Sequence, residues 1–194
     1  LCACILLGVL TCIPAIAMEK DALPSYIFDF TDADLTKKIS GVGNMTYTAT
    51  DGEYCTFTAS ANDPSMGLPT PEITVDKAAY LVIEYKTTSQ VMGEIYIARD
   101  DGVTFSQEPD SHLEWQWEAD GEWHRVIVPC TGWADVQNVA FTQLRFDPLH
   151  MHQGIKSGDE ILLRFFAFFE SEQAAKDFDL AEYHAYVAEQ EKQE

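Results

Sequence analysis

The sequence has 194 residues, with 32 Asp and Glu against 12 Lys and Arg, so its formal net charge is −20 at pH 7. A charge of this sign and size repels nucleic acid and anionic membrane surfaces, and we expect neither as a partner. Neutral or cationic partners remain, and the charge does not choose between them.

Residues 1–17 carry no charge and end in Ala15-Ile16-Ala17. An apolar run that ends in small residues is typical of the hydrophobic region and cleavage site of a secretory signal peptide. The basic n-region is missing, so we expect a signal peptide at 1–17 without it, and a secreted or cell-surface protein. No later segment reaches the length of a membrane span.

Two cysteines, Cys55 and Cys130, remain once the three in residues 1–17 are set aside. In an oxidising compartment two distant cysteines can form a disulfide. Two buried thiols in strands are the equally weighted alternative.

Short runs rich in β-branched and aromatic residues predict nine strands between residues 21 and 170. Asp-Gly pairs at 51–52, 101–102 and 120–121 lie between neighbouring runs, where a tight hairpin needs a residue that tolerates positive φ. With almost no helical periodicity, the pattern predicts an all-β antiparallel two-sheet β-sandwich, or jelly roll. Residues 62–71 contain three prolines and are predicted to be a loop. The predicted strands are 26–30, 45–49, 53–59, 80–86, 94–99, 113–118, 123–129, 139–146 and 160–169.

The pattern changes after Phe169. Ser171 can cap a helix with Glu172 in its first turn, and apolar residues follow at near-helical spacing. Residues 171–194 are therefore predicted to form a C-terminal helix and a polar tail.

The run from Glu114 to His124 contains three tryptophans. Because side chains alternate along a strand, Trp115 and Trp117 share one apolar face, and Glu114 and Glu118 share the polar one. Large rings on the apolar face of a sandwich strand usually pack in the core. The alternative is a flat platform on which sugar rings stack.

The two glutamates allow a third interpretation. Glu114, Gln116 and Glu118 resemble the Glu-x-Asp-x-Glu strand of one group of β-sandwich glucanases, in which paired carboxyl groups cleave the glycosidic bond. The central Asp of that pattern is Gln116 here, and the chain is short for such an enzyme. A retaining β-glucanase-like glycoside hydrolase is therefore the lesser alternative.

A more specific set of motifs occupies the second half of the chain: Glu122-Trp123-His124, Gly132-Trp133, residues 144–148 (LRFDP), Gly158-Asp159, and residues 168–172 followed by Ala174-Ala175. Their order resembles a galactose-binding-like or carbohydrate-binding-module-type β-sandwich of bacterial secreted and cell-surface proteins. The resemblance spans roughly residues 26–175, and it implies a non-catalytic binding module.

The motifs themselves look mainly structural. Asp147 can accept backbone hydrogen bonds where its strand ends, and Pro148 can stop sheet pairing; an Arg145–Asp147 pair that reads sugar hydroxyls is the alternative. Trp123 and Trp133 recur in the resemblance and are assigned to packing. That leaves Trp115, Trp117, Phe105 and Arg145 as the candidate ligand-binding residues.

The resemblance also suggests a structural calcium ion, and no other cofactor is expected. Oxygen donors near turns are plentiful, but none has the spacing of a recognised calcium loop. His150 and His152 could offer two imidazoles to a transition metal, although exposed histidines usually have no such role. The turn acids are Asp29, Asp32, Asp34, Asp63 and Asp159.

These observations together favour a non-catalytic carbohydrate-binding accessory module of a larger exported or cell-surface protein, with a polysaccharide or glycan as its partner. A structural or adhesion spacer without a small ligand is the alternative, because one scaffold serves many roles.

Overall fold

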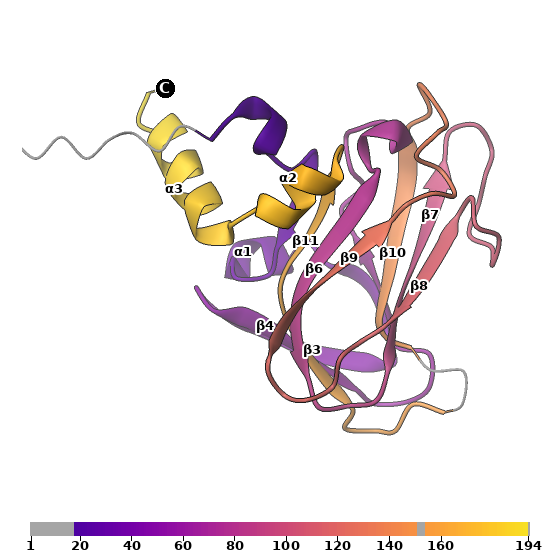
Figure 1. Cartoon of the computed structure of the whole chain (residues 1–194). Helices are drawn as coiled ribbons and strands as arrows, with labels where there is room; N and C mark the ends of the chain where they lie inside the picture. The colour runs from indigo at the N-terminus through magenta and orange to yellow at the C-terminus, as the bar shows by residue number, and fades with distance from the viewer. Residues whose placement is uncertain (1–17, 151–153, 194) are drawn as a thin grey trace, which may run out of the picture.

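The computed structural model describes residues 18–150 and 154–193, so the predicted signal peptide lies outside the described residues. Two antiparallel sheets face each other (Figure 1). The predicted two-sheet β-sandwich is confirmed. Sheet A contains, in spatial order, β3 (Met45–Thr50), β4 (Tyr54–Ala59), β11 (Glu160–Phe169), β6 (Tyr80–Thr87) and β9 (Trp123–Pro129), and β1 (Tyr26–Asp29) also pairs with β11. Sheet B contains β2 (Ser40–Gly43), β5 (Ser65–Leu68), β10 (Phe141–His150), β7 (Met92–Arg99) and β8 (His112–Gln116).

The core lies between the inner faces of the sheets. Along β11, Leu163, Phe166 and Phe168 point inward, and Phe146 of β10 meets the Phe166 ring with centroids 5.3 Å apart. All four side chains are fully buried. Alternating large side chains from two facing sheets fill the space that such a sandwich encloses, which explains why the strand pattern was legible in the sequence.

Strands β2 and β5 were not predicted. The prediction of a loop over residues 62–71 is wrong in part, because β5 lies within it. The short strand β5 fits between Pro64 and Pro69, and its Met66 and Leu68 point into the core. It pairs with β10 on one side and β2 on the other. Proline is tolerated at the ends of a strand, so the three prolines bound β5 without excluding it.

The Asp-Gly pairs all adopt the expected backbone. Gly52, Gly102 and Gly121 have φ of 76°, 97° and 82°. Of the three pairs, only Asp51-Gly52 closes a tight hairpin, between β3 and β4. Asp101-Gly102 opens a longer loop between β7 and β8, and Asp120-Gly121 carries the chain from β8 in sheet B to β9 in sheet A. The positive φ of the three glycines was predicted correctly. The tight hairpins predicted at Asp101-Gly102 and Asp120-Gly121 do not form.

The predicted C-terminal helix is present as two helices, α2 (Glu172–Asp177) and α3 (Leu180–Gln190). The Ser171 hydroxyl accepts a hydrogen bond from the Ala174 backbone N–H at 3.2 Å, and Asp179 caps α3 in the same way. Helix α3 therefore includes residues that were predicted to be a polar tail. Three short helices also form, η1 (Lys20–Ala22), α1 (Ala33–Thr36) and η2 (Val75–Lys77).

The helices cover part of the outer face of sheet A. Helix α2 packs against β11, β6 and η1, and Phe178 lies against the rings of Phe165 and Phe169. In Figure 1 both α2 and α3 lie on this side of the sandwich. This second apolar cluster fixes the C-terminal segment to the sheet. No helix formed by the described residues is long and apolar enough to cross a membrane.

Cys55 and Cys130 are both free and buried, so the disulfide alternative is wrong in this structure. Burial raises the pKa of the Cys55 thiol to about 12 and also raises the pKa of Cys130. Both thiols therefore stay protonated and unreactive at neutral pH.

Candidate functional site

Trp115 and Trp117 lie in the core, so the prediction of a stacking platform at these two residues is wrong. They are 8% and 2% exposed, and their ring planes meet at 87°. Trp117 Nε1 donates to the Pro148 carbonyl at 2.9 Å. Gly93 makes room for them, because a Cβ there would come within 2.4 Å of both rings. The apolar face of β8 faces inward, as strand alternation allowed.

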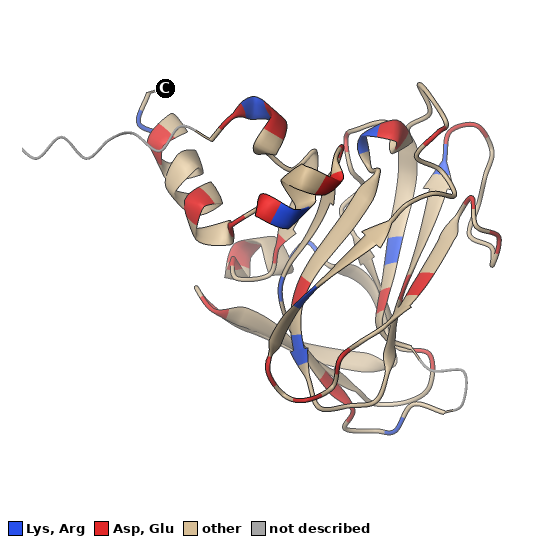
Figure 2. Ribbon diagram, in the orientation of Figure 1, with Lys and Arg blue, Asp and Glu red and all other residues tan. Residues whose placement is uncertain are grey.

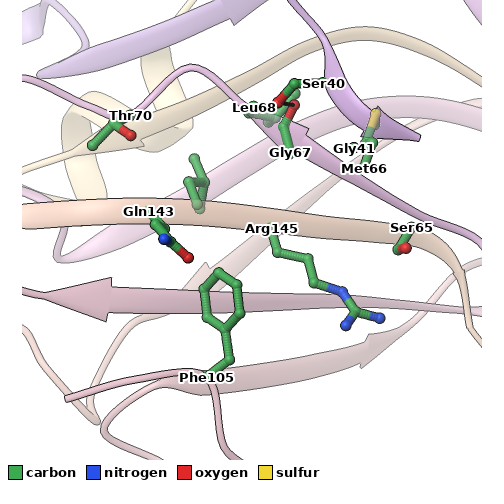
Figure 3. Close-up of a pocket in the computed structure, with 11 residues that line it drawn as sticks. Ser40, Gly41, Ser65, Met66, Gly67, Leu68, Thr70, Phe105, Gln143 and Arg145 are labelled. Atoms are coloured by element: carbon green, nitrogen blue, oxygen red, sulfur yellow. Dashed lines mark hydrogen bonds between the residues drawn. The ribbon is translucent and has the colours of Figure 1, made fainter. Parts of the chain in front are cut away.

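The other two candidate residues, Phe105 and Arg145, come together in a groove on the outer face of sheet B (Figure 3). We call it the Phe105 groove; its volume is about 480 Å³. Phe105 belongs to the loop between β7 and β8, and its side chain is 39% exposed. Figure 3 shows its ring pointing toward β10, beside Gln143 and Arg145. The opposite side is formed by β2 and β5, through Ser40, Gly41, Ser65, Met66, Gly67 and Leu68.

Gly67 allows the two short strands to lie close together. A Cβ at this position would stand 2.8 Å from the Ser40 hydroxyl oxygen, well inside van der Waals contact. The glycine therefore leaves the groove floor as bare backbone with serine hydroxyls around it. Backbone and hydroxyl groups of this kind give a ligand hydrogen-bond partners without adding charge.

Arg145 is held in a fixed position. Its Nε and Nη2 donate to the two carboxylate oxygens of Asp147 at 2.9 and 2.6 Å, and Nη2 also donates to Asp63 at 3.0 Å. The guanidinium carbon lies 5.2 Å from the centroid of the Tyr96 ring. Nη1 takes part in none of these bonds, so its N–H groups can serve a ligand. The predicted strand-end role of Asp147 is wrong, because β10 continues to His150. The carboxylate instead accepts from Arg145, which forms the pair considered as the alternative.

Asp147 is a buried carboxyl group, 1% exposed. Burial raises its pKa to about 6, although the Arg145 guanidinium acts in the opposite direction. The neighbouring Glu94 carboxylate adds to the rise by repulsion. At neutral pH the carboxyl group is still mainly ionised, so the bidentate pair with Arg145 is complete.

Glu94 is buried and forms the centre of a second polar cluster, which we call the Glu94 cluster: Glu94, Tyr96, Gln107, His112 and His150. The Glu94 carboxylate accepts from the Tyr96 hydroxyl, and its Oε2 lies 3.0 Å from His150 Nδ1. His112 Nε2 lies 2.6 Å from Oε1 without hydrogen-bond alignment, and the His112 ring stacks on Tyr96 with the ring centroids 4.7 Å apart. Gln107 donates to the Tyr96 hydroxyl. Because Gln107 belongs to the loop that carries Phe105, the cluster fixes that loop on the sheet.

Trp133, Trp123 and Pro148 differ in how far their positions agree with the roles predicted for them. Trp133 is fully buried and donates to the Ala78 carbonyl at 3.3 Å, which agrees with packing. Trp123 is only half-buried; it packs on the outer face of sheet A, where its ring lies 4.0 Å from the Arg164 guanidinium, and it does not belong to the core between the sheets. Pro148 does not end β10, because pairing shifts register around it and resumes at His150.

The turn acids do not gather at one place. Asp29 accepts from Thr31, Asp32 caps α1, Asp63 pairs with Arg145, and the two others pair locally. Among the described residues, one group of three potential ligands forms, and it consists of other residues: Glu118, Asp120 and His124. A structural calcium stays a prediction. The possible histidine metal pair lies partly outside the described residues, since His152 is not described; His150 contacts Glu94.

The glutamates of the glucanase-like pattern do not share one strand face. Strand β8 ends at Gln116, and Glu118 lies beyond it with its carboxylate 3.4 Å from His124 Nδ1. Glu114 remains on the outer face of β8. Strand alternation therefore ends before Glu118, and it does not place Glu118 on the same strand face as Glu114.

Residues Gln143, Ser40 and Ser65 of the Phe105 groove were not predicted. Gln143 precedes Arg145 by two residues on the same strand, so alternation could have found it. The serines could not be found in this way, because they reach the groove only through the pairing of β5 with β10 and β2.

Comparison with protein-family models and with curated proteins finds no match for this chain. Among solved structures, a point mutant of a family 29 carbohydrate-binding module aligns with 79% of this chain and 95% of its own, at 13% identity and a TM-score of 0.51. Another mutant of a family 29 module, complexed with cellulohexaose, aligns at 13% identity with a TM-score of 0.50, over 79% of this chain and 94% of its own. The chain has the β-sandwich fold of carbohydrate-binding modules, and at this identity the likeness concerns the fold alone.

A glycoside hydrolase domain, Endo-D from Streptococcus pneumoniae R6, also aligns, with 10% identity and a TM-score of 0.49. The alignment covers 70% of this chain and 21% of that domain. This chain thus spans about a fifth of that hydrolase domain.

Proposed function

We propose that this protein is a non-catalytic carbohydrate-binding module that holds a neutral glycan in the Phe105 groove. The observation that carries the proposal is the meeting of an exposed aromatic ring with a fixed guanidinium in one groove, on the open face of sheet B. The fold shared with family 29 modules is consistent with this role.

The groove has the two kinds of group that a sugar needs. The Phe105 ring offers an apolar surface to the C–H face of a pyranose, while Arg145 Nη1, the Gln143 amide and the Ser40 hydroxyl offer hydrogen bonds to its hydroxyl groups. Arg145 is already held by Asp147, so little side-chain entropy is lost when it binds. The net charge of −20 favours neutral over acidic glycans.

The wider setting is part of the same proposal. An uncharged segment that ends in Ala-x-Ala supports export, and we propose that the module is attached to a larger secreted or cell-surface protein. Individually weak contacts then gain strength through several modules bound to one polysaccharide.

The test is binding to a panel of neutral polysaccharides, measured by affinity gel electrophoresis and then by calorimetry with soluble oligosaccharides. We expect Phe105→Ala to weaken binding at least about tenfold, which corresponds to about 1.4 kcal/mol. Val42→Ala is the matched control, because Val42 is an exposed apolar side chain of similar exposure, 38%, that does not line the groove. It should bind like the unaltered protein.

Three results would decide against the proposal. Equal retention of the Phe105 and Val42 variants would remove the groove as the site. Failure of every glycan to bind the unaltered protein would favour the spacer alternative, and release of reducing sugar from β-glucans would favour the hydrolase.

A further inference from the structure

We propose a second carbohydrate-binding site on the opposite side of the sandwich, on the outer face of sheet A beside α3. We call it the Trp123 pocket; its volume is about 530 Å³. The ligand class, a neutral glycan, rests on the proposed function, whereas the site rests on different residues, elements and contacts. The two sites would make the module bivalent.

Trp123 and Tyr54 form the aromatic surface of this pocket. Trp123 comes from β9 and Tyr54 from β4, two strands that lie at separate positions in sheet A. Their ring centroids are nevertheless 6.0 Å apart, with the planes at 50°. The indole of Trp123 therefore lies across the face of the sheet instead of projecting from its own strand.

Arg164 covers one face of the indole, and part of the residue stays accessible. The Arg164 guanidinium carbon lies 4.0 Å from the ring centroid, which is close contact for a cation on an aromatic face. Trp123 is nonetheless only half-buried. Because the accessible part of Trp123 lines the pocket, it offers apolar ring surface on which the C–H face of a sugar can stack.

An ion network fixes this aromatic surface in place. Glu84 Oε1 lies 2.8 Å from Arg164 Nη1, and Oε2 lies 3.0 Å from Arg125 Nη2. Arg125 also donates to the Phe178 carbonyl at 2.5 Å. The network links the junction of α2 and α3, through Glu84 and Arg164, to the indole. A ring supported in this way is preorganised, so binding costs little side-chain entropy.

A purely structural role does not explain the exposure of Trp123. Further along the same outer face, Phe165 and Phe169 are fully buried under Phe178. The helices cover that part of the sheet and leave the tryptophan uncovered, with the start of α3 as the wall of the pocket. Glu53 and Asp179 line the pocket as well and can accept hydrogen bonds from sugar hydroxyls.

Tryptophan fluorescence can read this site directly. Of the four tryptophans, Trp115, Trp117 and Trp133 are buried and only Trp123 is half-exposed. We expect neutral oligosaccharides, tested one at a time from glucan, xylan and mannan series, to shift the emission and protect it from acrylamide quenching. Trp123→Phe should abolish that signal, and Tyr54→Ala should weaken binding at this site at least about tenfold.

The Phe105→Ala variant separates this inference from the proposed function. If both sites exist, this variant keeps the fluorescence response and loses one of two bound ligands in calorimetry. If the Trp123 pocket binds and the Phe105 groove does not, the fluorescence response remains in the Phe105 variants. Calorimetry then finds one bound ligand both in these variants and in the unaltered protein. If the Trp123 pocket does not bind, no oligosaccharide protects tryptophan from acrylamide, and Tyr54→Ala binds like the unaltered protein; either result overturns the inference.

Folding is controlled with Trp123→Phe, which keeps a ring on Arg164. Its thermal unfolding is expected to stay close to that of the unaltered protein, so a lost response cannot be ascribed to unfolding. Bivalency adds an independent readout: the unaltered protein should cross-link a soluble polysaccharide into turbid aggregates, and both Phe105→Ala and Trp123→Phe should prevent this. Turbidity that persists in Trp123→Phe would contradict two-site binding.

Discussion

The outer faces of the two sheets differ in whether helices cover them and in which side chains are buried there. On sheet A, Phe165 and Phe169 are sealed beneath Phe178 at the junction of α2 and α3. On sheet B, no helix of the described residues covers the face, and the buried side chains include the charged groups of Glu94 and Asp147. Figure 2 shows acidic residues spread over strands, loops and helices alike, so charge alone does not distinguish the faces.

The difference raises the question of what the buried carboxyl groups on sheet B contribute. Burying ionised groups costs free energy unless they are paired and hydrogen-bonded, and replacing such a cluster with apolar residues is often neutral or stabilising. Sheet A shows that this chain can cover an outer face with an apolar cluster. The Glu94 cluster and the Arg145–Asp147 pair are therefore better explained by what they position, namely Phe105 and Arg145, than by stability.

The largest expected effect concerns the apolar cluster on the outer face of sheet A, where Phe178 packs on Phe165 and Phe169. We predict that Phe178→Ala lowers the free energy of unfolding by about 3 kcal/mol, because it removes a buried ring from three aromatic neighbours and leaves a cavity. Urea denaturation followed by far-ultraviolet circular dichroism measures the change.

Phe105→Ala is the matched control, since it truncates the same residue type on the open face of sheet B. It should change the free energy of unfolding by no more than about 0.5 kcal/mol. Equal losses in the two variants would show that the Phe105 loop carries as much packing as the helical seal, and the contrast between the faces would then be wrong.

The next effect concerns Asp147 and depends on pH. Its pKa is raised to about 6 in the folded protein, from an ordinary value near 4. The folded state therefore binds this proton more tightly than the unfolded state, and the stability contributed by the protonated carboxyl group is present below about pH 4 and lost as the pH rises through 6. Relative to Asp147→Asn, the unaltered protein should lose about 2 kcal/mol between pH 4 and pH 7.

The difference between the two proteins is what must be measured, because other carboxyl groups titrate over the same range and cancel in the comparison. Parallel urea denaturation at four pH values from 4 to 7 gives that difference. If the difference in the free energy of unfolding were constant from pH 4 to pH 7, Asp147 would not be desolvated in the folded protein, and its raised pKa would be wrong.

Much of the fold could be predicted from the sequence because local signals agreed with it. Alternation identified nine strands, and Ser171 marked the start of the C-terminal helices. Strand β5 was missed since its four residues form a strand only through pairing with β10 and β2. A sequence shows periodicity within a segment, but pairing between distant segments has no local signal.

The tryptophans show the same limit at the level of the site. Alternation placed Trp115 and Trp117 on one face of the strand predicted over residues 113–118 and left a stacking platform open beside core packing. It gave no sign that Trp123 lies across the outer face of sheet A. Phe105 and Arg145 were both predicted as ligand-binding candidates. That they meet in one groove depends on the loop fixed by Gln107, which no spacing in the sequence reveals.

The smallest expected effect tests how Arg145 is held. Asp63 lies 3.0 Å from Arg145 Nη2, but its side chain is 72% exposed, and such surface ion pairs contribute little. Asp63→Asn should therefore change the free energy of unfolding by no more than about 0.5 kcal/mol. Since Asp147 keeps both of its hydrogen bonds to the guanidinium, Arg145 should stay in place, and glycan affinity should change less than about twofold, or about 0.4 kcal/mol. Urea denaturation and calorimetry measure the two quantities. A tenfold fall in affinity with unchanged stability would instead show that Asp63 itself contacts the ligand, and that the Phe105 groove extends beyond Ser65, the first residue of β5, to Asp63.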